Sequence, residues 1–114
     1  MKEIFTKQQI ISGIEKYFDI KNNMLFAGGQ SGEEVKAKHI AIYFLKTNTN
    51  LYTQEILDIV GRKQRGTILN AMKSVKNQIE VYPEYAKMIE EVKDSIKSID
   101  SNYDDIYLGN DFKN

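Results

Sequence analysis

A basic and polar segment between residues 61 and 76 carries the side chains best suited to bind a polyanion. It contains five arginines and lysines and no acidic residue. The chain as a whole is neutral, with 16 basic and 16 acidic residues, and residues 77–114 hold nine acids against four lysines. A neutral protein with one concentrated basic segment can still place a positive patch against phosphate groups.

The side chains of this segment match the groups that a DNA major groove exposes. Arginine binds guanine, asparagine binds adenine, threonine contacts a phosphate oxygen or a thymine methyl group, and lysine contacts phosphate. On this basis Arg65, Asn70 and Gln64 are candidates to read bases. The candidates for phosphate contacts are Arg62, Lys63, Thr67 and Lys73. The alternative interpretation of the same residues is a solvated turn and helix face.

A helix-turn-helix over about residues 53–80 would position these side chains. A short helix is expected over 51–60, with Thr53 as a possible cap, followed by a turn at Gly61 and a second helix over 66–79. Four apolar residues recur at helical spacing in the second helix and are predicted to face inward: Leu69, Met72, Val75 and Ile79. The outward side would then present Arg65, Thr67, Asn70, Lys73, Ser74 and Asn77.

The rest of the chain predicts an all-α fold, a compact bundle of about five to six helices. Thr6 caps a predicted helix over 7–18, and a central helix runs from 31 or 33 to about 47–50. Its inward residues are Ile40, Ala41, Phe44 and Leu45. A single turn at 24–26 is also expected, and the last helix begins at Tyr82 and Pro83 with the stripe Tyr85, Ile89, Val92, Ile96 and Ile99. We expect one domain over 1–99 and an acidic, mobile tail over 100–114.

Several classes of function find no support in the residues. The chain has no cysteine, and its single histidine, His39, is expected at a surface or boundary position rather than as a base or ligand. The glycine-rich segment 28–32 lacks the spacing of a phosphate-binding loop. We therefore predict no enzyme activity, metal, cofactor or bound nucleotide. No membrane association is expected either, and the predicted location is the cytoplasm, in association with the nucleoid.

The segment from Glu55 to Ala71 is similar to a known motif, Pro-Glu-Ile-Gly followed by Phe-Gly-Gly-Arg-Asp-His-Thr-Thr-Val-Leu-His-Ala. Residues 14–18, Leu25, 36–42 and 82–85 extend the similarity in the same order and spacing. On these residues the chain from about 11 to 96 resembles the C-terminal DNA-binding domain of the bacterial replication initiator DnaA, a Trp-repressor-like helix-turn-helix. The resemblance implies binding of double-stranded DNA.

Departures from the family pattern fall on the positions that contact DNA in that family. The motif Asp-His-Thr-Thr corresponds to residues 64–67, and only Thr67 is retained. Lys63 replaces an arginine, and Asn70 replaces a histidine. The family's arginine-rich loop corresponds to residues 28–34, which include no basic side chain, although Lys36 and Lys38 remain available for backbone contacts. We therefore expect a target other than the usual origin sequence.

Two hypotheses for function follow. The first is a stand-alone regulator or replication accessory protein that binds double-stranded DNA without an ATPase. The second is a protein–protein interaction module that kept the fold and lost sequence-specific DNA binding. The tail over 100–114 is either a disordered end or a segment that docks on a protein partner or covers the basic helix.

Overall fold

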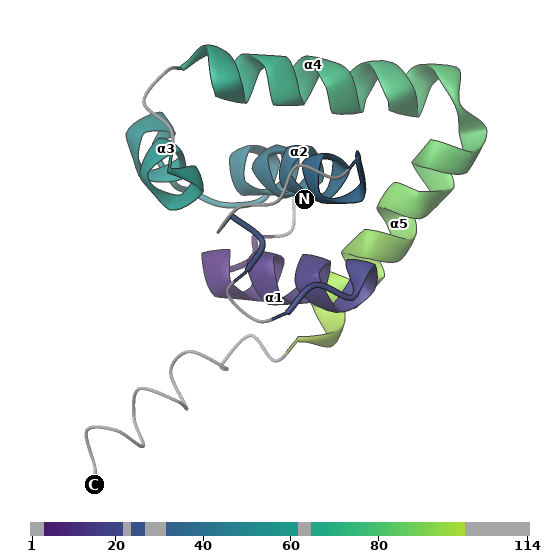
Figure 1. Ribbon diagram of the computed structural model, residues 1–114, viewed down its shortest axis with the longest axis horizontal. Coiled ribbons are helices and arrows are strands. Elements are labelled where there is room, and N and C mark those ends of the chain that lie inside the picture. Colours follow the sequence, from purple (N-terminus) through teal and green to yellow (C-terminus); the bar gives the residue numbers. More distant parts are fainter. Residues whose placement is uncertain (1–3, 22–23, 27–31, 62–64, 100–114) are drawn as a thin grey trace, which may run out of the picture.

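Five α-helices make up the fold within the residues that the computed structural model describes, which are 4–21, 24–26, 32–61 and 65–99 (Figure 1). The helices are α1 (Lys7–Phe18), α2 (Gly32–Thr47), α3 (Thr53–Val60), α4 (Gly66–Val81) and α5 (Pro83–Ser98). No strand occurs in these ranges. The all-α prediction is therefore confirmed, and the tail predicted over 100–114 lies outside the described residues.

Local signals in the sequence set several of the helix ends. Thr6 caps α1: its hydroxyl accepts a hydrogen bond from the Gln9 backbone N–H at 3.0 Å, and the Gln9 side chain accepts one from the Thr6 N–H at 3.2 Å. Gly61 ends α3 in the left-handed conformation at φ 73°, which glycine adopts without a steric cost. Pro83 occupies the first turn of α5, where its missing N–H costs no helical hydrogen bond.

The start of α3 differs from the prediction. Tyr52, and not Thr53, is the residue that precedes the first helical turn, and its backbone N–H donates to the Glu55 carboxylate at 2.8 Å. Thr53 is already helical, and its hydroxyl accepts a hydrogen bond from the Lys46 ammonium group at 3.3 Å. The Glu55 carboxylate therefore accepts a hydrogen bond from the backbone at the start of α3, a role that was expected of the Thr53 hydroxyl.

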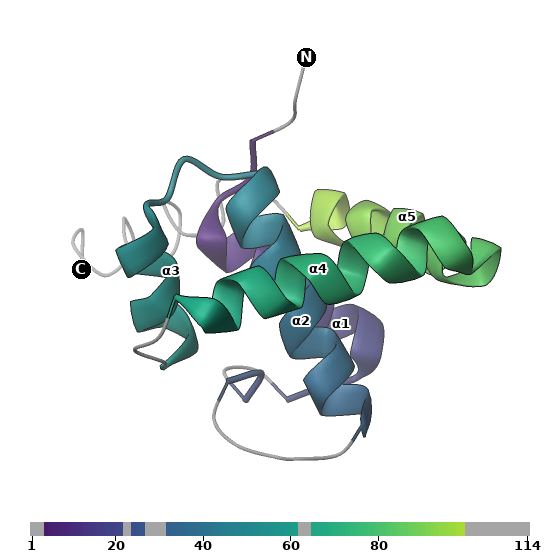
Figure 2. The same cartoon turned by 90° about the horizontal axis from the view of Figure 1, so that it is seen from above.

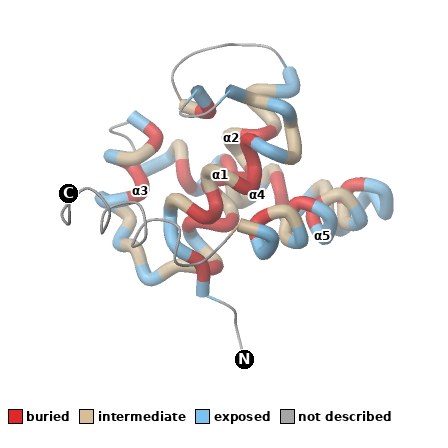
Figure 3. Tube along the Cα trace, turned by 90° about the horizontal axis from the view of Figure 1, so that it is seen from below, coloured by how far each residue is buried: buried red, intermediate tan, exposed pale blue. Residues whose placement is uncertain are grey.

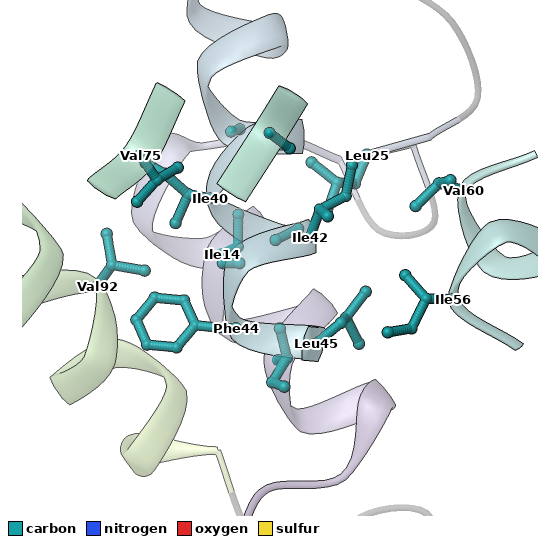
Figure 4. Packing of buried hydrophobic residues seen from close by; sticks show 14 of the residues in the cluster. Ile14, Leu25, Ile40, Ile42, Phe44, Leu45, Ile56, Val60, Val75 and Val92 are labelled. Carbon is teal, nitrogen blue, oxygen red and sulfur yellow. The ribbon is translucent and has the colours of Figure 1, made fainter. Parts of the chain in front are cut away.

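Helix α2 lies in the middle of the molecule, with α1 on one side and α4 crossing its other side (Figures 1 and 2). Its predicted inward residues, Ile40, Ala41, Phe44 and Leu45, are all buried. Side chains from every other helix meet them, including Ile14, Ile56, Val75 and Val92 (Figure 4). Figure 3 shows buried positions gathered where these helices overlap, whereas residues 80–84, at the corner between α4 and α5, are exposed. Burial of this shared core holds α4 in place.

A close crossing joins α1 to α5. A Cβ atom added at Gly13 would lie 2.5 Å from the Cα of Ile96 and 2.9 Å from its backbone nitrogen. The Ser95 hydroxyl also donates to the Gly13 carbonyl at 2.8 Å. Only a residue without a side chain lets the two backbones approach this far, so the sequence position of Gly13 fixes where the helices cross.

One acidic side chain is buried beside the turn at 24–26. Glu15 of α1 is 2% exposed, and its carboxylate accepts a hydrogen bond from the Leu25 backbone N–H at 3.2 Å. Leu25 itself is buried in the core. Because a buried polar group must be hydrogen-bonded to be tolerated, this contact ties the 24–26 turn to α1.

Candidate nucleic-acid interface

Helices α3 and α4 form the predicted pair on either side of a turn. Helix α3 ends at Gly61 and α4 begins at Gly66, with the N-terminal end of α4 next to α3 (Figures 1 and 2). Three predicted contact residues between α3 and α4 in the sequence, Arg62, Lys63 and Gln64, lie outside the described residues. The remaining candidates can be placed on α4 and α2.

The buried face of α4 is rotated from the one that apolar spacing predicted. Ile68, Ala71 and Val75 are buried against the core, whereas Met72 and Ile79 are half-buried. Leu69 was predicted to face inward, and this is wrong, because its side chain is 65% exposed. Ile68 takes the inward place instead: Ile68, Ala71 and Val75 follow each other at intervals of three and four residues, and the side of the helix that they share is the one that meets the core.

The opposite side of α4 is a continuous exposed surface. We call this surface the outer face of α4; its exposed residues are Arg65, Leu69, Asn70, Lys73, Lys76 and Asn77. Three of them are basic, and α4 has no acidic residue before Glu80. The outer face is therefore cationic over its N-terminal three turns, and it lies at one edge of the molecule, away from α1 (Figure 1).

The predicted candidates on α4 differ in how accessible they are. Arg65, Asn70 and Lys73 are exposed, and Thr67 is half-buried. Ser74, also expected on the outward side, is half-buried, and its hydroxyl and carbonyl accept hydrogen bonds from the Gln78 side chain at 3.1 and 3.3 Å. Arg65, Asn70 and Lys73 are thus brought together on one surface, with Thr67 at its margin.

The N-terminal end of α4 adds backbone donors to this surface. The first helical hydrogen bonds run from the N–H groups of Ile68 and Leu69 to the Arg65 carbonyl, at 3.1 and 3.3 Å. The Arg65 side chain makes no capping hydrogen bond. Amides of a first helical turn have no acceptor within their own helix, and together with the helix dipole they favour a nearby anion. A phosphate group next to Arg65 would be attracted both by the guanidinium group and by these backbone amides.

Lys36 and Lys38 occupy a different element. Both are half-buried on α2, the helix that α4 crosses. His39 is half-buried beside them, in agreement with the predicted boundary position, and desolvation lowers its pKa below the usual value of 6.5. Lysine stems can be partly covered while the charged end stays at the surface, so half-burial is compatible with a phosphate contact.

Other chemistry finds no site among the described residues. They contain no group of three histidine, cysteine or acidic side chains that could hold a metal ion. None of the described helices combines the length and apolar composition needed to cross a bilayer. The adjacent acids Glu90 and Glu91 are exposed on α5, and the Tyr17 hydroxyl donates to the Glu91 carboxylate at 2.6 Å. That hydrogen bond is the first cause of a raised pKa at Tyr17.

Known proteins with the same sequence pattern identify the fold. Residues 7–75, from the start of α1 into α4, match the family described as bacterial dnaA protein helix-turn-helix. The chromosomal replication initiator protein DnaA of Bacteroides fragilis is 32% identical over 92 residues, covering 81% of this chain and 19% of that protein. The initiator of Bacteroides thetaiotaomicron is 30% identical over the same length, covering 81% and 20%.

An initiator from another genus gives the same result. The DnaA protein of Wolinella succinogenes is 30% identical over 97 residues, which are 85% of this chain and 22% of that protein. The chain therefore spans about a fifth of the length of the curated relatives it matches. The five-helix fold, the pair α3 and α4, and these matches agree, and the chain belongs to the bacterial DnaA helix-turn-helix family of DNA-binding domains.

Proposed function

We propose that this protein binds double-stranded DNA sequence-specifically, with the outer face of α4 in the major groove. The observation that carries the proposal is the outer face itself, where Arg65, Asn70 and Lys73 are exposed on one side of α4. The N-terminal part of such a helix is the part that contacts base edges. The proposed process is regulation or accessory work in DNA replication, in the nucleoid, without an ATPase.

The proposal divides the contacts by what each side chain can recognise. Arg65, Asn70 and Gln64 would contact base edges, since guanidinium and amide groups form paired hydrogen bonds with guanine and adenine. The residues proposed to contact phosphate or sugar are Lys36, Lys38, Arg62, Lys63, Thr67 and Lys73. Phosphate contacts position the helix, and base contacts determine the sequence that it prefers.

Salt dependence of binding tests the proposal. Each lysine–phosphate contact releases condensed counterions, so the slope of log K against log salt changes by about 0.9 per contact. Lys73→Ala should therefore weaken binding to all duplexes alike and flatten the slope by about that amount. Lys7→Ala is the matched control, because Lys7 is exposed on α1, on the far side of α2 from α4. The titrations need no added nucleotide.

Two results would contradict the proposal. If the unmodified protein shows no salt-dependent affinity for a random duplex, DNA binding has been lost and an interaction module is the better interpretation. If Lys73→Ala and Lys7→Ala change the slope equally, the outer face of α4 is not the contact surface. A separate check is Arg65→Ala or Asn70→Ala, which should relax preference at one base pair, by roughly 1–3 kcal/mol.

A further inference from the structure

An exposed leucine stands in the middle of the cationic outer face of α4. Leu69 is 65% exposed, although Ile68 beside it is 2% exposed and fills the core. Arg65 lies one turn before it and Lys73 one turn after it, and both are exposed. Removing an apolar side chain from water is favourable in free energy. A partner surface that covers the outer face of α4 would therefore bury Leu69 and be stabilised by it.

The surroundings of Leu69 do not suit an apolar protein partner. Docking surfaces for proteins are contiguous apolar patches, often several hundred Å² in area. The exposed neighbours of Leu69 on the outer face are instead charged or polar: Arg65, Asn70, Lys73 and Lys76. The other exposed apolar residues of α4 and its C-terminal corner, Val81 and Tyr82, are at the opposite end of the helix. Met72, one turn after Leu69, is half-buried, so Leu69 is the one exposed apolar side chain among the polar residues of the outer face.

A DNA major groove has the same character, with one kind of apolar group among polar ones. Its floor presents hydrogen-bond donors and acceptors, and thymine adds a C5-methyl group, which apolar side chains contact. We propose that Leu69 is a specificity-determining residue that contacts a thymine methyl group. This inference rests on the proposed function, because it requires α4 to lie in the major groove.

The position of Leu69 along α4 fits this role. It is the fourth residue of the helix, and the N-terminal residues of a recognition helix are those that reach base edges. Asn70 follows directly and is also exposed, so an apolar and an amide side chain lie next to each other on the outer face. Since asparagine suits adenine and leucine suits the thymine methyl group, the pair predicts a preference for A·T base pairs where these two residues reach.

Replacing thymine with uracil tests the contact, since the two bases differ only by the methyl group. The preferred duplex is first selected from a random pool with the unmodified protein, and each thymine in it is then changed to uracil. One replacement should weaken binding about fourfold, the value of one buried methyl group. Leu69→Ala should bind the thymine duplex about fourfold more weakly and should be insensitive to uracil at that same position.

Matched variants keep the result unambiguous. Leu69→Ala removes an exposed side chain, so its thermal unfolding should equal that of the unmodified protein. Val81→Ala, which truncates an apolar residue that is 63% exposed on the same helix, should keep full sensitivity to uracil. If Leu69→Ala responds to uracil as strongly as the unmodified protein does, or weakens binding to all sequences equally, the inference is overturned. Failure of the proposed function is a different result, in which the unmodified protein shows no salt-dependent duplex binding at all.

Discussion

Replacing Gly13 with alanine tests how the crossing of α1 and α5 is held. The substitution has two opposing effects on the free energy of unfolding. Alanine is favoured over glycine within a helix by about 1 kcal/mol, which would stabilise α1. Against this, the new Cβ atom would lie 2.5 Å from the Cα and 2.8 Å from the Cγ1 of Ile96, which is fully buried.

The size of the clash decides which effect is larger. Non-bonded carbon atoms normally stand about 3.5–4.0 Å apart, so the helices must separate by roughly 1 Å at this point. The nearest obstacle is backbone, which cannot rotate away as a side chain could. Overpacking of this kind costs about 1–3 kcal/mol, and stretching the hydrogen bond from Ser95 to the Gly13 carbonyl costs about 1 kcal/mol more. We expect a net loss of about 2 kcal/mol.

Thermal and urea unfolding measure this difference. A loss of about 2 kcal/mol should lower the Tm by roughly 10 °C in a domain of this size. Gly66→Ala is the control, since it places the same side chain at a helical glycine with no atom within 4 Å, and its stability should stay within about 1 kcal/mol of the original. A Gly13→Ala variant as stable as the original would refute the reasoning, because helix propensity would then outweigh the close contact.

Three further changes have expected outcomes. Gly61→Ala should lower the stability by about 1 kcal/mol in urea unfolding, because residue 61 is left-handed at φ 73°, and Gly61→Asn should lose less. Thr6→Ala removes the hydroxyl that accepts from the Gln9 N–H and should lower the free energy of unfolding by about 1 kcal/mol, whereas Thr6→Ser should keep both the hydrogen bond and the stability. Burial raises the pKa of Tyr85 from 10.0 to about 12, so the folded protein keeps a proton that the unfolded chain releases; stability should be constant below about pH 10 and fall as the pH rises toward 12. Tyr85→Phe should flatten that decline in unfolding measured at about pH 9 and pH 11, and an unchanged slope would exclude Tyr85 as its source.

Helices α1, α2 and α5 could be predicted from the sequence because their signals are local and agree with each other. Thr6 and Pro83 mark helix starts by their own chemistry. The apolar stripe of α5 has no competing stripe, and the main inward residues predicted for α2 and α5 are buried. Where capping chemistry and apolar spacing point to the same boundary, no knowledge of the neighbouring helices is needed.

The rotation of α4 could not be predicted in the same way. Ile68 and Leu69 are adjacent apolar residues, about 100° apart around the helix, and each can join Val75 in a stripe that fits the helical period. The spacing of Leu69, Met72, Val75 and Ile79 assigned Leu69 to the core, whereas the fully buried Ala71 belongs to the stripe of Ile68. Which stripe is buried depends on the side of α4 that meets α2, and that is a property of the packed molecule.

For the candidate site, too, the residue types could be selected from the sequence, but the side of α4 on which each side chain lies could be predicted only in part. Arg65, Asn70 and Lys73 could be selected from residue type and spacing, and all three are exposed on one side of α4. Leu69 was missed because an apolar residue in a helical stripe is ordinarily assigned to the core. The sequence does contain the alternative stripe of Ile68, Ala71 and Val75, but the helical period alone does not favour it over the stripe that includes Leu69.

The Gln9 side chain has a consequence for how this fold can be joined to other polypeptides. Its carboxamide accepts from the Thr6 N–H and donates to the Ile99 carbonyl at 3.1 Å, so the first turn of α1 touches the end of α5. The first and last residues of the helical domain are thus close together. They lie beside α1, and α2 separates α1 from α4 (Figure 1). A tag, reporter or second module fused at either junction would be attached beside the first turn of α1 and not on the outer face of α4. A circular permutant that links the two junctions needs only a short bridge, and new ends could be opened elsewhere without blocking the outer face of α4.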